Sequence, residues 1–412
     1  MGAREDRSRW DALIVGAGPA GSAVATLLAR TGAAVLLLDR ARFPRDKPCS
    51  EYLSPAATGV LDRLGGGILP RVEGTAHARL VGMRVVAPSG ATMVGRFAAA
   101  HVHAPPRPYS FALPRTAFDA ILRQAAEEAG AAVHEGVAVE DLLVEEGRMA
   151  GVVARGPDGR HGSIRARVVV GADGLRSVVA RRLSVRRVSF PRRVAFTAHV
   201  AQAAGVEDLG EMHVGHAGYV GLGPIGDGLT TVALVLPRAE LQRRPRDPRH
   251  DFFAELDRFP GLRGRFDHAR MVRRVLTTGP FAQWSQRVTM DGACLVGDAA
   301  DFFDPFTGQG IYNALRGAEL AAAAIAGALA THDAVPARAL APYARARRAE
   351  FAGKWVLERL IGLGVGWPAL AERVVTRLAH RPALADLLVG ATGNFVPARA
   401  VLHPAALVRM VL

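Results

Sequence analysis

A glycine pattern near the N-terminus constrains the fold of this chain more than any other feature. Gly16, Gly18 and Gly21 have the spacing G-x-G-x-x-G and follow "DALIVG", an apolar run typical of a buried parallel strand. Residues 19–32 have helical spacing and stop at a glycine, and residues 33–40 are a second apolar strand. Because strand, helix and strand within about 30 residues form a βαβ unit, we expect an α/β fold.

Each glycine of this pattern has a physical role if a dinucleotide binds there. Gly16 permits a tight turn, Gly18 lets the backbone approach a pyrophosphate, and Gly21 lets the helix pack closely on the strand. The helix N-terminus offers free N–H groups to the diphosphate, and Asp39 would accept hydrogen bonds from ribose hydroxyls. Helix packing alone would explain Gly21 but not Asp39. We therefore predict a dinucleotide site that also includes three flanking residues, Pro19, Ala20 and Arg40.

Charge and cysteine content argue against several classes of protein. The 412-residue chain has a formal net charge of +14, but its arginines are scattered and no helix-turn-helix or zinc-finger spacing occurs, so no nucleic-acid partner is expected. Two cysteines, Cys49 and Cys294, are too few for a disulfide framework, and no CxxC spacing points to a metal. We expect neither a metal site nor a disulfide.

The sequence predicts a cytoplasmic protein whose membrane contact, if any, is peripheral. The start, "MGAREDRSRW", lacks the apolar segment of a secretory signal. The apolar run at 319–330 is too short and too rich in alanine to span a bilayer. The positive charge favours a weak attraction to anionic membrane surfaces. The oligomeric state stays open.

The remaining segments extend the α/β pattern and add a β-rich region and a helical region. Residues 115–136 repeat the order helix then strand, with Gly130 ending the helix, and residues 165–174 form another strand. Between 194 and 236 the chain is β-rich with glycines at hairpin-like intervals, which predicts an antiparallel sheet. Beyond about residue 340 it is helical and basic.

Two further motifs carry a family resemblance. The segment "GADGLRS" (171–177) resembles the Asp-Gly motif of the group A flavoprotein monooxygenases, the para-hydroxybenzoate hydroxylase-like proteins. The resemblance implies that Asp173 and Gly174 lie near the pyrophosphate of FAD. It also implies that Arg115, in "LPRTAFDAIL", lies near the cofactor; the alternative is a surface residue at a helix start.

The segment "CLVGDAADFFDPFTGQGIYNAL" (294–315) is similar to the second FAD fingerprint of that superfamily, which places Gly297 and Asp298 at the ribityl chain. The loop after it opens a long helix, whose N-terminus can stabilise the negative charge of a reduced flavin. The residues assigned to this contact are Pro305, Gly308, Gln309, Gly310 and Ile311. Together the three motifs predict bound FAD.

The loop "RFPRDKPCSEYLSP" (42–55) resembles a segment of the geranylgeranyl reductase subgroup, with Ser50 where that subgroup commonly has glycine. The resemblance implies that the loop runs towards the flavin, with Lys47 and Cys49 as contacts. Cys49 and Glu51 are candidate proton donors. The alternatives are a solvated Lys47, a buried inert Cys49 and a structural pair between Glu51 and Arg45. Tyr52 can pack on the cofactor or in the core.

The predicted architecture is an α/β, Rossmann-like (GR2-type) FAD-binding domain, an antiparallel β-sheet substrate domain and a helical C-terminal region. The FAD-binding domain is assigned residues 1–75, 113–185 and 276–335. The substrate domain is assigned residues 76–112 and 186–275, and the C-terminal cap residues 336–412.

By resemblance, the favoured function is an FAD-dependent monooxygenase that uses NAD(P)H and O₂ to hydroxylate or epoxidise through a flavin C4a-hydroperoxide. Pro305 would shape the oxygen site and Tyr219 would line the substrate cavity, unless it is a core residue. The alternative is a geranylgeranyl reductase-like enzyme that saturates isoprenoid double bonds. A halogenase fits less well, because the W-x-W-x-I-P motif of tryptophan halogenases is absent. The fourth hypothesis is a non-catalytic flavin-binding partner protein.

The expected substrate is a lipophilic aromatic, polyketide or isoprenoid molecule. The C-terminal stretch "VPARAVLHPAALVRMVL" combines apolar faces with arginines, which suits an apolar ligand, a membrane surface or a capping bundle. His199 and His213 lie on predicted strands and are read as core or surface residues.

Overall fold

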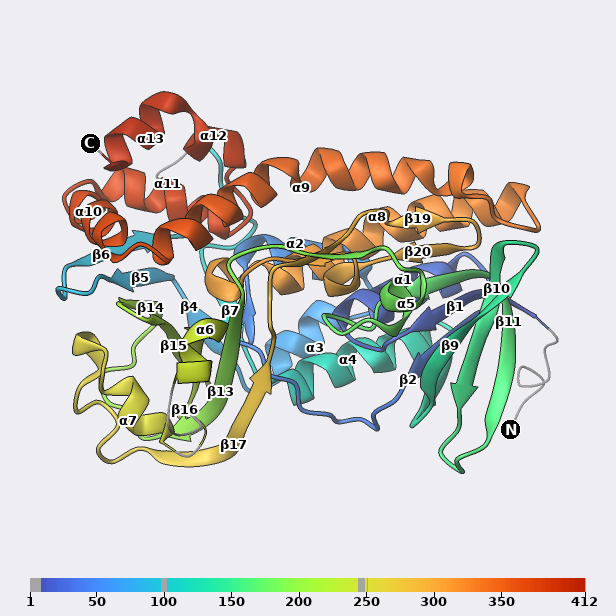
Figure 1. The fold of residues 1–412 in the computed structure, drawn as a ribbon, viewed down its shortest axis with the longest axis horizontal. Helices are drawn as coiled ribbons and strands as arrows, with labels where there is room; N and C mark the ends of the chain where they lie inside the picture. The colour runs from blue at the N-terminus through green and yellow to red at the C-terminus, as the bar shows by residue number, and fades with distance from the viewer. Residues whose placement is uncertain (1–8, 98–101, 244–248, 250, 412) are drawn as a thin grey trace.

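The computed structural model describes residues 9–97, 102–243, 249 and 251–411. Residues 1–8 lie outside the described residues. They make up most of the N-terminal stretch "MGAREDRSRW", which was predicted not to be a secretory signal. Figure 1 shows a lobe built around β1, β2 and β11, a second lobe of strands from β5 to β17, and C-terminal helices over one end. The predicted fold class is confirmed.

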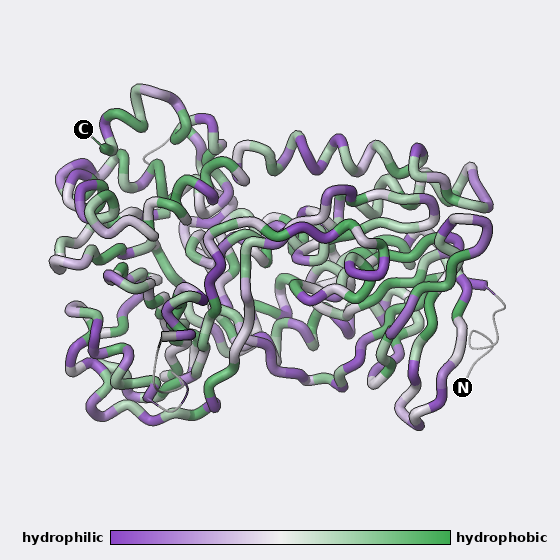
Figure 2. The backbone as a smooth tube through the Cα atoms, viewed as in Figure 1, coloured by the Kyte–Doolittle hydropathy of each residue, from purple (hydrophilic) through white to green (hydrophobic). Residues whose placement is uncertain are grey.

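The first lobe contains the predicted parallel sheet. Its strands run in the order β19-β20-β11-β1-β2-β8, with bounds Thr289–Met290, Ala293–Leu295, His161–Gly171, Trp10–Val15, Val35–Asp39 and Ala132–Glu135. Pairing is parallel from β20 to β8, while β9 (Ala138–Glu145) and β10 (Arg148–Arg155) form antiparallel pairs beside β11. Figure 2 shows the strands of this sheet as mainly hydrophobic, as expected for a sheet covered on both faces.

Helices cover one face of this sheet, and alternation along β1 sorts its side chains between two cores. Ala12 and Ile14 join the core under the helices, whereas Leu13 and Val15 join the core shared with β9 and β10. The helices of this lobe are α1 (Pro19–Arg30), α2 (Pro55–Leu64), α3 (Ile68–Gly74), α4 (Arg115–Glu128), α5 (Val178–Arg182) and α8 (Gly310–Thr331).

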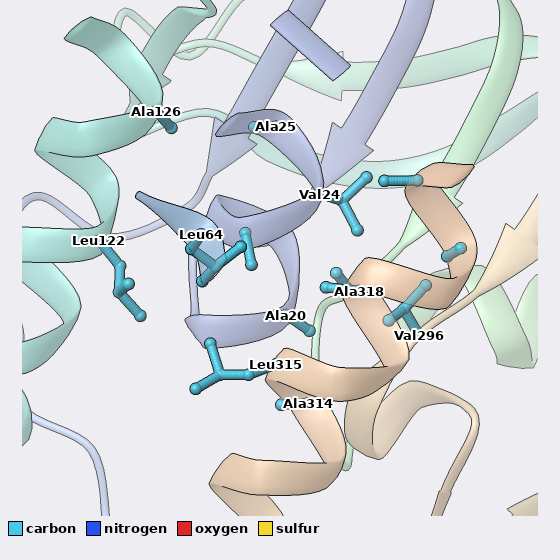
Figure 3. Close-up of a cluster of buried hydrophobic side chains, with 14 of the residues drawn as sticks. Ala20, Val24, Ala25, Leu64, Leu122, Ala126, Val296, Ala314, Leu315 and Ala318 are labelled. Atoms are coloured by element: carbon cyan, nitrogen blue, oxygen red, sulfur yellow. The ribbon is translucent and has the colours of Figure 1, made fainter. Parts of the chain in front are cut away.

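Small residues let α1 approach its neighbours closely. Figure 3 shows Ala20 and Val24 of α1 facing Ala314 and Ala318 of α8. At the start of α1, a Cβ atom on Gly21 would lie 1.8 Å from the carbonyl oxygen of Gly16. Only glycine therefore permits this approach of helix to strand.

The second lobe is built on a seven-stranded sheet. Its order is β17-β13-β16-β15-β14-β5-β6, with bounds Arg270–Thr278, Arg193–Ala201, Leu229–Pro237, Gly218–Gly226, Leu209–Gly215, Gly82–Val86 and Thr92–Arg96. The sheet is not purely antiparallel as predicted, because β14 pairs with β5 in parallel. This exception arises because β5 and β6 come from an earlier part of the chain. The predicted boundary at 275/276 falls inside β17.

Shorter elements connect the two lobes. One three-stranded sheet has the order β3-β7-β4 (Tyr52–Leu53, Ser110–Ala112, Ala78–Leu80), and another has the order β12-β18-β21 (Arg186–Val188, Gln283–Ser285, Asp301–Phe302). Two short helices, α6 (Arg238–Arg243) and α7 (Phe252–Leu256), follow the large sheet.

The C-terminal region is helical and packs on the second lobe. It comprises α9 (Ala337–Val365), α10 (Pro368–Ala379), α11 (Pro382–Thr392), α12 (Ala398–Leu402) and α13 (Pro404–Val411). Helices α10 and α11 contact β6, and α9 contacts α8, so this region bridges the two lobes along one side (Figure 1).

The apolar run 319–330 belongs to the 22-residue helix α8, which is longer than the run itself suggests. Within the described residues, α8 is the one helix long and apolar enough to cross a membrane by length and composition. It contacts α1, α2 and α9 and buries residues such as Leu315 and Ile325. Core packing accounts for its apolar character.

Replacing Gly21 by alanine should destabilise the fold, because the new Cβ meets backbone that cannot rotate away. We expect the Gly21→Ala variant to lose about 3 kcal/mol or more of unfolding free energy. Gly327→Ala is the matched control, since Gly327 also lies in a helix and a Cβ added there would meet no atom within 4 Å. It should match or slightly exceed the wild type. Equal unfolding midpoints in urea for the two variants would contradict the packing argument.

Candidate functional site

A cavity of about 560 Å³ lies where the two lobes and the C-terminal helices meet. At one end its wall is formed by the N-termini of α1 and α8 together with charged side chains. Most predicted cofactor residues line it: Gly18, Pro19, Ala20, Lys47, Cys49, Arg115, Gly174, Asp298, Pro305, Gly308, Gly310 and Ile311. The predicted substrate residue Tyr219 lines it as well.

The loop 42–51 reaches this end of the cavity because both of its ends are anchored. At its first anchor, Arg45 Nη1 lies 3.1 Å from Asp119 Oδ2 on α4. Asp119 is fully buried and also accepts two hydrogen bonds from Arg115, at 2.7 and 2.6 Å. One carboxylate thus pairs with two guanidinium groups, and Arg45 has a second, more distant partner in Asp39, at 3.8 Å. Arg115 is only 4% exposed, so the surface alternative for this residue is wrong.

The second anchor is Glu51, which has a positive φ of 62° and is fully buried. Its Oε2 lies 2.5 Å from His199 Nε2, and its Oε1 accepts the backbone N–H of Arg115 at 3.2 Å. Arg273 donates to the same oxygen at 3.4 Å and to Asp46 at 2.9 Å. The predicted pairing of Glu51 with Arg45 is therefore wrong. Nor does Glu51 line the cavity, so its carboxyl does not fit the role of direct proton donor.

Between the two anchors, Lys47 and Cys49 face the cavity. Lys47 is half-buried rather than solvated. Burial, and secondarily the charge of Arg115, lowers the pKa of Lys47, while Asp298 raises it. Cys49 Sγ accepts the backbone N–H of Glu51 at 3.3 Å, and the residue lines the cavity and is only partly buried, so it is not a fully buried core residue.

Electrostatics at this end are dominated by burial and by a few close charges. Burial alone would lower the pKa of Arg115, but Asp119 and Cys49 outweigh it and raise that pKa above its ordinary value. Burial raises the pKa of Asp298, although Lys47 and Arg115 oppose this effect. A cationic residue and two helix N-termini therefore surround a space suited to an anionic group.

The residues at this end fit FAD. A Cβ on Gly18 would meet only the Arg45 side chain, at 3.4 Å, so the backbone at this position is open to close approach. Around the start of α8, three buried polar atoms have no hydrogen-bond partner among the described residues: Thr307 Oγ1, Gln309 Oε1 and Asn313 Oδ1. Such atoms are usually satisfied in a complete structure. Of the three residues, Thr307 lines the cavity, where a polar heteroaromatic ring is a suitable partner.

The other predicted residues are not on the wall of the cavity: Gly16, Gly21, Asp39, Arg40, Glu51, Asp173, Gly297 and Gln309. Asp39 accepts the backbone N–H groups of Ala17 and Ala41, each at 2.8 Å. Asp173 Oδ2 accepts the N–H of Val178 at 2.6 Å, while its Oδ1 has no partner among the described residues. Burial raises the pKa of Asp173. Their cofactor contacts stay predictions.

A buried hydrogen-bond network that was not predicted from the sequence holds Tyr219 in place. Its hydroxyl donates to Asp304 Oδ1 at 2.6 Å, and Arg193 donates to Asp304 Oδ2 at 2.6 Å. The ring of Phe306 contacts Tyr219 edge-on. Burial, and then the charge of Asp304, raises the pKa of Tyr219 well above its ordinary value, so the phenol keeps its proton. No sequence signal links Arg193 to Asp304, which are 111 residues apart.

The other end of the cavity is apolar. Its wall comes from the seven-stranded sheet and the C-terminal helices, with Leu80, Met83, Met212, Leu357, Leu370, Val375, Leu407 and Met410 among its residues.

His199 and His213 are both buried and hydrogen-bonded to carboxylates, at 2.5 and 2.8 Å. Among the described residues, no group of three or more His, Cys, Asp or Glu side chains is placed to hold a metal ion.

This fold and this cavity define an FAD-dependent oxidoreductase. A profile of the family described as "FAD binding domain" matches residues 9–356. The chain is 31% identical to a digeranylgeranylglycerophospholipid reductase of Methanothrix thermoacetophila over 335 residues, covering 79% of this chain and 80% of the relative. The chain belongs to this family of FAD-binding proteins and, within it, to the geranylgeranyl reductase-related group.

Two solved structures show the same fold. A geranylgeranyl bacteriochlorophyll reductase-like protein from Thermoplasma acidophilum superposes with a TM-score of 0.80 at 22% identity, covering 98% of each chain. The myxobacterial chondrochloren halogenase, an FAD-dependent halogenase, superposes with a TM-score of 0.76 at 25% identity, covering 85% of this chain and 82% of the halogenase.

Glu358, on α9, should make the stability of the fold depend on pH. Burial, and then Asp301, raises its pKa to about 8, from 4.5 in an unperturbed chain. The folded protein holds this proton more tightly, so the stabilisation is complete below the unfolded pKa and is lost as pH rises through about 8. Between about pH 5 and pH 9, the wild type should lose on the order of 2–4 kcal/mol more unfolding free energy than Glu358→Gln.

Urea unfolding at several pH values measures this difference. Glu207→Gln serves as the control, because the side chain of Glu207 is 63% exposed. That variant should follow the wild-type pH curve. If Glu358→Gln also follows it, Glu358 does not titrate as described.

Proposed function

We propose that this protein is an FAD-dependent reductase that saturates carbon–carbon double bonds in the isoprenoid chain of a lipophilic substrate. The observation that carries the proposal is the single cavity whose polar end fits FAD and whose other end is lined by aliphatic side chains. The reductase names of the curated relatives support the same reading. This proposal adopts the geranylgeranyl reductase-like enzyme, the alternative in the sequence analysis, in place of the monooxygenase that was favoured there.

In such a reaction, bound reduced FAD supplies a hydride, and NAD(P)H is the proposed source of the electrons. The chain supplies position and environment. Met83, Met212 and Leu357 exclude water and hold an alkyl chain by apolar contact alone. Lys47 and Arg115 offer positive charge where the cofactor is anionic. The helix N-terminus at Gly310 acts in the same direction.

Saturating an alkene also requires a proton, and we assign its transfer to Cys49. The sulfur accepts the N–H of Glu51, which leaves the thiol hydrogen to point away from that contact. The guanidinium of Arg115 interacts with the same side chain and can neutralise the thiolate after the proton has moved to the substrate carbon. After the saturated product has left, the thiolate takes up a new proton from bulk solvent, which restores the thiol. Tyr219 is tied to Asp304 and serves as a wall of the site.

Oxygen-dependent chemistry on a lipophilic substrate is the second candidate. The likeness to the chondrochloren halogenase favours it, and the same dry cavity would protect an oxygen-derived intermediate from water.

An anaerobic single-turnover experiment separates the two. The FAD-loaded protein is reduced, mixed with a geranylgeranyl lipid without oxygen, and followed by flavin absorbance and by mass spectrometry of the lipid. The reductase predicts that the flavin is reoxidised while the lipid gains two hydrogens. Reoxidation only after oxygen is admitted, with oxygen or a halide entering the lipid, would support the second candidate and overturn the first.

Filling the apolar end should shorten the accepted chain. Gly223 on β15 lines the cavity, and a Cβ there would have no neighbour closer than 3.7 Å, so the Phe ring of Gly223→Phe has room to enter it. We expect turnover of a geranylgeranyl lipid to fall at least about tenfold, while a geranyl lipid changes less than about threefold. Gly162→Phe, at an exposed position of β11, is the control. Equal losses for both lipids at unchanged FAD content would contradict this role.

A further inference from the structure

Large apolar side chains are exposed on one face at the end of α9. Val356, Leu360 and Leu363 follow at intervals of four and three residues, which places them on one side of α9, and Trp367 lies just beyond the end of that helix, at the N-cap of α10. They are 48%, 47%, 54% and 64% exposed, and Val408 on α13 is 52% exposed. These five are among the twelve exposed large hydrophobic residues in the described chain, so exposed apolar side chains are concentrated in this region. We call these five residues together the α9 apolar stripe.

The α9 apolar stripe is continuous with the wall of the cavity. Leu360 belongs to both, since it is exposed and also lines the cavity. Its neighbours Ile361 and Gly364 line the cavity, as do Leu370 on α10 and Leu407 on α13. An apolar molecule could therefore move from the stripe into the cavity without crossing a polar surface.

The C-terminal helices also carry exposed positive charge. The exposed arginines are Arg359 on α9, Arg373 and Arg377 on α10, Arg399 on α12 and Arg409 on α13. The same region holds few acidic residues. Glu358 is buried, Glu372 accepts hydrogen bonds from Ser89, and Asp386 accepts the backbone N–H of Arg96. Figure 2 shows this mixture of hydrophobic and hydrophilic residues along the C-terminal helices. Glu372 and Asp386 keep their negative charge, but six arginines between residues 359 and 409 outnumber them, so the region has a net positive charge.

We propose that the α9 apolar stripe and its arginines dock the protein on an anionic lipid bilayer, with the cavity mouth facing the membrane. The arginines complement lipid phosphates at the headgroup level, Trp367 suits the interface, and the aliphatic side chains enter the upper acyl region. Charge complementarity favours a bilayer over a second copy of this chain, because two copies would bring like-charged arginines together. The docking goes beyond the proposed reaction and does not depend on which chemistry follows.

Vesicle sedimentation tests the docking without using activity. The full-length, FAD-loaded protein is mixed with vesicles of phosphatidylcholine alone or of equal parts phosphatidylcholine and phosphatidylglycerol. We expect at least about tenfold tighter binding to the anionic vesicles, weakened by added salt. Wild-type protein that stays in the supernatant with anionic vesicles would overturn the proposal.

Variants locate the surface. Leu363→Glu combined with Trp367→Glu should weaken binding to anionic vesicles at least about tenfold. Val188→Glu combined with Phe190→Glu is the matched control: it introduces the same charge at residues 56% and 76% exposed elsewhere, and should bind within about twofold of the wild type. If the stripe variant binds as tightly as this control, the stripe is not the docking surface.

A second pair keeps the test valid if the stripe variant does not fold. Arg373→Glu combined with Arg377→Glu changes only exposed positions of α10 and should also weaken anionic binding by about tenfold; unchanged binding would overturn the role of the arginines. Sedimentation equilibrium without lipid covers the second-copy alternative. A dimer that the stripe variant dissociates, combined with wild-type indifference to vesicles, would assign the surface to self-association instead.

Discussion

The salt bridge of Asp119 with Arg115 and Arg45 is the interaction on which the rest of the site depends. This one carboxylate pairs with the buried guanidinium of Arg115 and with the partly buried guanidinium of Arg45, which also lies 3.8 Å from Asp39. Removing it would leave the buried charge of Arg115 without its carboxylate partner, at a cost of several kcal/mol. The same bridge fastens the loop 42–51 to α4, while Glu51 fastens its far end to α4, β13 and β17. Lys47 and Cys49 lie between these anchors, and both line the cavity.

Charge confined to one end leaves the rest of the cavity free to be apolar. The seven-stranded sheet contributes small and aliphatic side chains, and α9, α10 and α13 close the space above them. The FAD-binding lobe alone would therefore provide a cofactor site without a place for a lipophilic molecule. Under the proposed function, the cofactor supplies the chemistry, and the sheet and the C-terminal helices select the substrate.

The sequence predicted what local geometry determines and missed what distant segments bring together. The βαβ unit followed from Gly16 and Gly21, because both positions are limited by close backbone contacts. By contrast, Glu51 and His199 are 148 residues apart and meet only through the arrangement of the lobes. Asp119 and Arg273 carry no motif and were not singled out. The parallel pairing of β14 with β5 was missed for the same reason.

The central claim is that flavin and lipophilic substrate occupy adjoining parts of one cavity. Titrating the FAD-loaded protein with a fully saturated isoprenoid lipid, which cannot react, tests it most directly by flavin absorbance. The account predicts a saturable change in the visible flavin spectrum at one lipid per chain, with FAD retained. Displacement of FAD by the lipid, or lipid binding that leaves the flavin spectrum unchanged, would contradict it.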